Sequence, residues 1–322
     1  MAKCIVVDAD QLEYDSFINL HFEAFNEIGT ETLLYSSKFF HWKFHPPVGI
    51  GQIALIYEKN KLVSTNTMIP FELCVNGRKI IGWQATDAAT AKNSRRKGYS
   101  SSCLKALLGL IKRDEVLFLF PNQNAKHFVS EIGAYSKGTI HTWLKIPLTR
   151  QNNSPPEIST ISRFGLEQDR FAEALRMHSS SVQVFCSANY LNWCYVNNPI
   201  YKYVIFSFDS DEGRKGFAII RSRELLGKKI ISIEELWGME DQIIKKLIRF
   251  IQWWSIRRNV HWILIQDNGH LTTAGLRYGF LPIPTRMLPT RNAVMAFLTP
   301  GNISNTLRET NWQVLTGNWD HI

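Results

Sequence analysis

The feature that most constrains the fold of this chain is an internal duplication. Residues 39–44 read Phe-Phe-His-Trp-Lys-Phe, and residues 190–195 read Tyr-Leu-Asn-Trp-Cys-Tyr. Both segments follow the order aromatic, apolar, polar, Trp, variable, aromatic, and proline follows each of them. Trp42 and Trp193 hold the same place in the two copies and lie 151 residues apart. A repeat of this length predicts a duplicated domain.

The correspondence continues downstream of these segments. In each copy, two strand-like segments joined by a turn precede a basic and apolar segment, which leads to a helix and a buried strand. The matched ranges are 52–57, 62–69 and 78–82 in the first copy and 203–208, 216–221 and 228–232 in the second. We therefore predict an N-terminal domain over residues 1–149 and a C-terminal domain over 157–322. The polar, proline-containing stretch 150–156 is the predicted linker.

Composition supports two ordinary hydrophobic cores. The chain has 322 residues, of which 45% are hydrophobic and 20% are charged, and this length suits two domains. The net charge of +9 favours anionic ligands. Because the basic residues are scattered and form no nucleic-acid-binding signature, we expect no nucleic-acid partner.

The cysteines and the apolar runs bear on location and on metal binding. Five cysteines without a Cys-x-x-Cys motif are typical of a reduced, cytoplasmic protein. No apolar run reaches the ~18 residues of a membrane-spanning helix, so we expect no membrane span. No group of His, Cys, Asp or Glu residues has metal-ligand spacing, and we expect no metal.

A basic turn with a glycine is the strongest indication of a ligand. A strand-like run that ends at Thr90 leads into Arg95-Arg96-Lys97-Gly98, and a helix with apolar residues at 104, 107, 108 and 111 follows. Such a turn directs free backbone N–H groups and the positive end of a helix dipole at one point, where phosphate binds. The alternative is a basic turn that is merely solvated.

The pattern Arg95-x-x-Gly98-x-Ser100 resembles the acyl-CoA pyrophosphate loop of the GNAT acetyltransferase superfamily, in which Ser100 would be glycine or alanine. The resemblance implies an α/β (α+β) fold of two tandem GNAT-like domains, each a mixed, mainly antiparallel sheet flanked by helices. It also implies acyl-CoA, either acetyl-CoA or a short hydroxyacyl-CoA, as the co-substrate. The residues that it places against the cofactor are Ala88, Thr90, Arg95, Arg96, Lys97, Gly98, Tyr99, Ser100, Ser101, Asn122 and Asn124.

The second copy lacks this loop. Glu240-Asp241-Gln242 stands where the first copy has its basic residues and glycine, and an acidic helix start repels a diphosphate. We therefore predict one CoA per chain, bound by the N-terminal copy.

The acid and base that many GNAT relatives use are missing. Those relatives place a glutamate on the fourth strand, where this chain has Gln84, and a tyrosine after the fifth strand, where it has Val129. Asp87 is the nearest carboxylate, although strand alternation puts it on the face opposite Gln84. His127 is a candidate acid. Gln84, Asp87 and His127 are the candidate catalytic residues, with structural or solvated roles as the alternatives.

The tandem copies resemble N-acyltransferases that modify nucleotide-linked amino sugars for bacterial surface polysaccharides. The resemblance implies transfer of an acetyl or short (hydroxy)acyl group to the amine of such a sugar, in a cleft between the copies. The predicted acceptor contacts are Trp83, Trp143, Trp237, Arg286 and Arg291, with core packing or a solvated loop as the alternatives. We expect a monomer or weak homodimer. Two other functions stay open: an aminoacyl-tRNA-dependent transferase of cell-wall peptide synthesis, and a non-catalytic acyl-CoA-binding protein.

Overall fold

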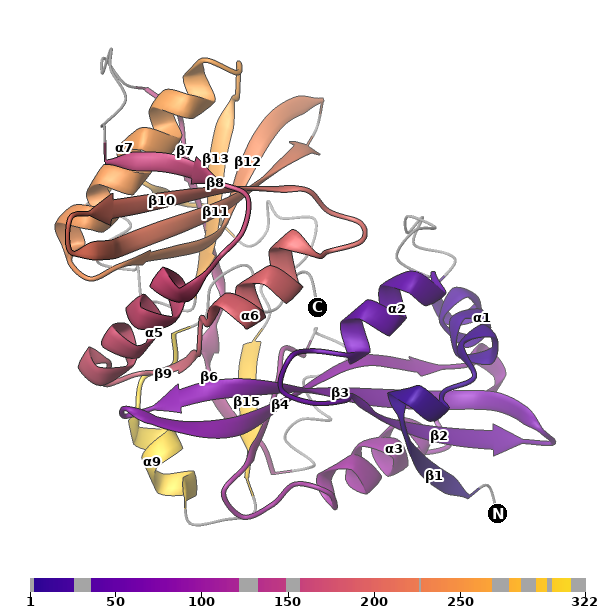
Figure 1. The fold of residues 1–322 in the computed structure, drawn as a ribbon. Helices are drawn as coiled ribbons and strands as arrows, with labels where there is room; N and C mark the ends of the chain where they lie inside the picture. The colour runs from indigo at the N-terminus through magenta and orange to yellow at the C-terminus, as the bar shows by residue number, and fades with distance from the viewer. Residues whose placement is uncertain are drawn as a thin grey trace.

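The structure is a computed structural model, and it describes residues 3–25, 36–121, 133–148, 157–225, 227–267, 278–284, 294–299 and 303–313. The chain forms two mixed sheets flanked by helices, which confirms the predicted fold class (Figure 1). In the first half the elements are β1 (Cys4–Asp8), α1 (Tyr14–Phe25), α2 (Ser37–Phe44), β2 (Gln52–Glu58), β3 (Lys61–Val75), β4 (Arg78–Thr90), α3 (Tyr99–Leu108), β5 (Val116–Leu119), β6 (Tyr135–Thr139) and β7 (His141–Lys145).

The second half repeats this order, with an additional short strand and a closing helix. Its elements are β8 (Ile158–Ile161), α5 (Leu166–His178), β9 (Val182–Val184), α6 (Ala188–Leu191), a π-helical turn η5 (Asn192–Val196), β10 (Tyr203–Ser210), β11 (Gly213–Leu225), β12 (Lys228–Gly238), α7 (Asp241–Ile256), β13 (Trp262–Asp267), β14 (Leu281–Pro282), β15 (Val294–Leu298) and α9 (Ile303–Glu309).

The two sheets have matching strand orders. The first runs β1-β2-β3-β4-β5-β15-β6, and the second, read in the same direction, runs β8-β10-β11-β12-β13-β7-β14. Neighbouring strands are antiparallel except for β4 with β5 and β12 with β13, which are parallel. In Figure 1, α1 and α2 lie on one face of the first sheet and α3 lies on the other. The helices α5 and α6, on one side, and α7, on the other, cover the second sheet in the same way.

Each half contributes strands to the sheet of the other half, and the short strand β9 of the second half pairs with β3 at the side of the first sheet. β7 comes from the first half but pairs with β13 and β14 in the second sheet. β15 comes from the second half but lies between β5 and β6 in the first sheet. The predicted domain boundaries, 1–149 and 157–322, stay predictions, and these two strands cross them. Sequence patterns identify a strand but not its partner, because pairing depends on contacts that are distant in the sequence.

The duplicated tryptophans meet between the two halves. The rings of Trp42 and Trp193 stack with centroids 5.1 Å apart. The Nε1–H of Trp42 donates to the carbonyl of Trp193 at 2.8 Å, and the Nε1–H of Trp193 donates to the carbonyl of Trp42 at 2.9 Å. This reciprocal contact relates the copies by an approximate twofold axis and places the sequence repeat at their junction.

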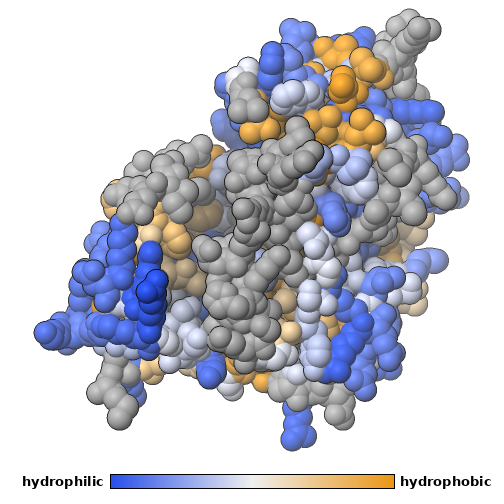
Figure 2. All heavy atoms as spheres, turned by 180° about the vertical axis from the view of Figure 1, so that it is seen from behind, coloured by the Kyte–Doolittle hydropathy of each residue, from blue (hydrophilic) through white to orange (hydrophobic). Residues whose placement is uncertain are grey.

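The surface of the second sheet carries apolar side chains. Figure 2 shows them in the view from behind, on the lobe that this sheet forms. Large apolar residues exposed on or just after its strands include Ile146, Leu148 and Leu281. The expectation of a monomer or weak homodimer stays a prediction.

Candidate active site in the N-terminal half

A pocket of about 370 Å³ opens where β4 ends and α3 begins. It is lined by Ala24, Phe25, Ala88, Thr90, Ser94, Arg95, Arg96, Gly98, Tyr99, Ser100 and Ser101. The fold thus brings together the predicted cofactor residues of the strand and the loop, with Lys97 as the exception. The other two, Asn122 and Asn124, lie outside the described residues.

The loop that forms the pocket has the backbone that anion binding requires. Arg96 and Gly98 have positive φ angles of 64° and 77°, and Gly98 is the N-cap of α3 without a side-chain capping bond. The first N–H groups of an α-helix have no partner within the helix, so those of α3 are available to a ligand. A Cβ atom added to Gly98 would meet nothing within 4 Å, and a diphosphate can therefore approach the backbone there.

Beside the loop, β4 separates from β5. The parallel pairing joins Gly82 to Val116 and ends where Ala85 meets Leu119, whereas β4 continues to Thr90. Residues 86–90 therefore have no described strand on that side. The peptide groups of this stretch can bond an extended ligand arm instead. Ala88 is exposed here, and its small side chain leaves room.

A β-bulge in β4 sets the position of Asp87. The register with β3 shifts between Thr65 and Thr67, and Asp87 has a positive φ of 46°. The Nζ of buried Lys43 lies 2.8 Å from Asp87 Oδ2 and 3.3 Å from Thr86 Oγ1. Two consecutive side chains of β4 thus point to the same face, the one covered by α2.

This bulge corrects the sequence prediction that Asp87 lies opposite Gln84. Gln84 precedes Thr86 by two residues, so regular alternation puts both on one face, and the bulge adds Asp87 to it. Gln84 is 2% exposed, and its Oε1 has no hydrogen-bond partner among the described residues. A buried amide oxygen of this kind is suited to receive an N–H group from a ligand. His127 and Val129 lie outside the described residues.

Sequence reasoning missed two residues next to Asp87. Lys43 occupies the position of the repeated motif that was treated as variable, and its side chain is only 4% exposed. His21 of α1 is also buried. Burial lowers the pKa of His21 to about 4, with Asp87 opposing this shift and Lys43 adding to it. The imidazole is therefore neutral near pH 7. The sequence did offer one indication of Lys43, because it is a charged residue within a helical segment that is otherwise rich in aromatic residues.

The basic side chains of the loop have different partners. Arg95 donates to the backbone carbonyls of Thr90, at 3.3 Å, and Ala24, at 3.2 Å, so it joins the loop to the end of α1. Lys97 forms an ion pair with Glu58 at 2.9 Å and does not line the pocket. Arg96 lines the pocket and makes no hydrogen bond or ion pair with any described residue.

Two of the predicted acceptor tryptophans, Trp143 and Trp237, are core residues, which corrects their assignment as cleft walls, whereas the assignment of Trp83 stays a prediction. Trp143 and Trp237 are buried, and their indole N–H groups donate to Asp267 at 2.9 Å and to Glu235 at 2.7 Å. Trp83 is partly buried and donates to Glu115 at 2.9 Å. A carboxylate partner satisfies the one polar atom of each ring and permits its burial. Arg286 and Arg291 lie outside the described residues.

The corresponding region of the second half is closed. A Cβ atom added to Gly238, at the end of β12, would lie 3.0 Å from Ile244 and 3.2 Å from Ile243, both on α7. Glu240 is the N-cap of that helix. Close packing at Gly238 and an acidic helix start disfavour a diphosphate at the end of β12, in agreement with the missing loop.

A buried carboxyl group in the second half predicts a pH-dependent stability. Glu235 accepts from Tyr195 at 2.6 Å and from Trp237. Burial raises its pKa from 4.5 to about 7, although both hydrogen bonds oppose this. The folded state therefore binds the proton more tightly, and stability falls as the pH rises from 4.5 to 7. Between these two pH values the unfolding free energy should fall by about 3 kcal/mol, and Glu235→Gln should remove this fall. Denaturant unfolding at both pH values measures it.

The control for this prediction is Glu224→Gln, which changes an exposed glutamate of the neighbouring strand β11. It should leave the difference in unfolding free energy between the two pH values as in the unmodified protein. An unchanged pH dependence in Glu235→Gln would contradict the assignment of the raised pKa to this group.

In the described part of the chain, no helix is long and apolar enough to cross a membrane. Within the same residues, no group of three or more His, Cys, Asp or Glu side chains is placed to hold a metal ion.

Comparisons with known proteins agree with this geometry. Residues 7–137 match the family model described as an acetyltransferase (GNAT) domain. The fold is shared with GCN5-related N-acetyltransferases from Anabaena variabilis (TM-score 0.67, 10% identity, 92% of this chain and 72% of that one) and Kribbella flavida (0.64, 9%, 92% and 71%). It is also shared with a tandem GNAT protein from the clavulanic acid biosynthesis pathway (0.57, 11%, 92% and 98%). A search of curated proteins finds no match.

The family match covers the half of the chain that holds the loop, and the fold of the whole chain is that of GNAT acetyltransferases. Residues 7–137 are its GNAT acetyltransferase domain, and the chain as a whole has the tandem GNAT fold.

Proposed function

We propose that the N-terminal half binds one acyl-CoA and transfers its acyl group to an amine. The observation that carries this proposal is the pocket at the start of α3, where open space faces Gly98 and Arg96 has no hydrogen-bond or ion-pair partner among the described residues. These residues fit the diphosphate of CoA, because N–H groups and a guanidinium supply the donors that phosphate oxygens need. GNAT domains use acyl-CoA, and the carrier supplies an acyl group as a thioester.

The catalytic contribution of this chain lies along β4. The stretch 86–90, which has no described strand beside it on the side of β5, orients the acyl-carrying arm, and orientation contributes about 7–11 kcal/mol in favourable cases. In the proposed step the amine nitrogen bonds to the acyl carbon and the carbon–sulfur bond to CoA breaks; Asp87 receives the proton that the nitrogen loses, and the departing CoA thiolate takes up a proton from solvent. Once the nitrogen has begun to bond to the acyl carbon, its N–H is strongly acidic. The Asp87 carboxylate, although it is paired with Lys43, is therefore basic enough to accept the proton. Gln84 Oε1, which has no hydrogen-bond partner among the described residues, is the proposed acceptor for the other N–H of the amine.

For the acceptor, we keep the nucleotide-linked amino sugar as the proposed class, acylated in the cytoplasm for surface polysaccharide synthesis. The net charge of +9 favours an anionic acceptor. A sugar amine is partly neutral near pH 7, which suits a site without a strong base. The second half retains its fold without the phosphate loop, and this is expected if it serves the acceptor. Arg286 and Arg291 are the proposed contacts for the diphosphate.

Isothermal titration with CoA tests the first step and should give a stoichiometry near one. Release of free thiol from acetyl-CoA, screened against uridine- and thymidine-diphosphate amino sugars, then tests transfer. Turnover with one of them and not with the free sugar would support the acceptor. Binding of CoA without turnover on any class of amine would instead support a non-catalytic acyl-CoA-binding protein.

A further inference from the structure

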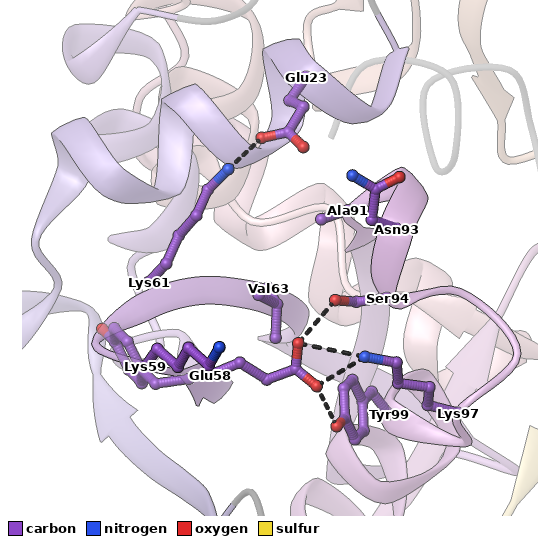
Figure 3. Close-up of a pocket in the computed structure, with 11 residues that line it drawn as sticks. Glu23, Glu58, Lys59, Lys61, Val63, Ala91, Asn93, Ser94, Lys97 and Tyr99 are labelled. Atoms are coloured by element: carbon purple, nitrogen blue, oxygen red, sulfur yellow. Dashed lines mark hydrogen bonds and ion pairs between the residues drawn. The ribbon is translucent and has the colours of Figure 1, made fainter.

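A second pocket, of about 750 Å³, lies on the other side of the loop. Ser94 and Tyr99 line both pockets, so the loop is the wall between them. At the centre of the second pocket is Glu58, the last residue of β2 (Figure 3). Its position is fixed by a tight turn into β3, in which Lys59 and Asn60 have positive φ angles of 49° and 65°.

Glu58 holds the loop from both of its ends. Its carboxylate accepts from Ser94 Oγ at 3.0 Å, before the loop, and from Tyr99 Oη at 2.5 Å, after it. Lys97 Nζ, within the loop, donates to both carboxylate oxygens, at 2.9 and 3.3 Å. Figure 3 shows these three side chains converging on one carboxylate. Together they lower the pKa of Glu58 to about 2, so it is charged at any physiological pH.

We infer that Glu58 is a positioning residue that fixes the loop in its phosphate-binding shape and withdraws Lys97 from the phosphate. This inference rests on the proposed binding of acyl-CoA. It assigns the direct contact with the diphosphate to Arg96 and to the N–H groups at the start of α3, and it makes Lys97 part of the support. A carboxylate that contacts the loop from its other side repels an anion bound in the first pocket. The presence of Glu58 at this position therefore needs a compensating role.

Removing the charge of Glu58 distinguishes this inference from the alternative that Glu58 only repels the diphosphate. If Glu58 only repelled the diphosphate, Glu58→Gln would raise CoA affinity, because a negative charge is lost and Lys97 becomes free. If Glu58 fixes the loop, the same change should lower CoA affinity about tenfold, because a neutral amide with one acceptor oxygen weakens or loses all three bonds, from Ser94, Lys97 and Tyr99. The two readings predict opposite signs.

The test measures CoA binding by isothermal titration for Glu58→Gln, Tyr99→Phe and the double variant. Tyr99→Phe removes only one hydroxyl and serves if Glu58→Gln does not fold. Each single variant should weaken binding, and the double variant should weaken it by less than the product of the two, since both act on one contact. Hydrogen exchange of the peptide covering residues 95–101 should rise in the free protein, while exchange in the second sheet stays unchanged.

Arg96→Gln and Lys97→Met form the matched comparison within the loop. Arg96→Gln should lower CoA affinity about tenfold and flatten its dependence on ionic strength, because a direct charge contact is lost. Lys97→Met should change affinity less than threefold, a modest effect because Ser94 and Tyr99 still hold Glu58.

Three outcomes would overturn the inference: undiminished or raised affinity in Glu58→Gln, equal losses in Arg96→Gln and Lys97→Met, or exchange that rises throughout the molecule. Absence of CoA binding by the unmodified protein would refute the proposed function itself. The two failures are therefore distinguishable.

Discussion

Gly98→Asp should abolish CoA binding while leaving the fold intact. The added side chain projects into open space, so no protein atom needs to move to accommodate it. It places a carboxylate where the diphosphate approaches the backbone, and like charges in contact cost several kcal/mol. We expect CoA affinity to fall by at least about 100-fold. Isothermal titration measures the loss, and the thermal unfolding midpoint reports the fold.

Gly227→Asp is the matched control for this substitution. Gly227 lies in the turn between β11 and β12, has a φ of 67°, and likewise has nothing within 4 Å of an added Cβ. The two variants therefore share the backbone strain and the added charge but differ in location. If both bind CoA equally well, the pocket beside Gly98 does not hold the diphosphate.

Asp87→Asn should lower the turnover of acetyl-CoA with its amine by about 10²–10⁴-fold, the range for losing a general base. Asparagine has nearly the same shape and tolerates the positive φ at this position. The affinity for CoA should stay unchanged, because Asp87 does not line the diphosphate pocket. Thiol release measures turnover, and titration measures affinity.

The stability of Asp87→Asn needs its own control, because the change leaves buried Lys43 without its counter-ion. Adding Lys43→Met removes that unpaired charge and should restore the unfolding free energy. If Asp87 acts only as the partner of Lys43, activity returns together with stability in the double variant. If Asp87 takes the proton, stability returns and activity does not.

The sequence predicted the fold class and the loop because both depend on local patterns. Strand, turn and helix follow one another between residues 79 and 111, and the glycine at 98 has the left-handed backbone that its place in the turn implied. The two copies were visible because Trp42 and Trp193 occupy equivalent helical positions, where the structure pairs them.

The remaining features depend on contacts that no local pattern encodes. One inserted residue in β4 turned Asp87 to the face of Gln84, and a bulge of this kind is decided by the partner strand. Glu58 contacts the loop through a hairpin that is distant in the sequence, and its role is invisible without the fold. The burial of Trp143 was likewise not predicted, because its carboxylate partner, Asp267, is distant in the sequence.

Because β7 and β15 are exchanged, each half needs a strand from the other half to complete its sheet. A fragment that ends before residue 150 would lack the strand between β5 and β6, two strands away from β4, which lines the pocket. It would also leave β7 without its partner strands, and an exposed strand edge promotes aggregation. The half without a phosphate loop therefore cannot be lost in evolution or deleted by engineering without opening the sheet of the half that has one. A change that destabilises either half is therefore expected to destabilise both sheets.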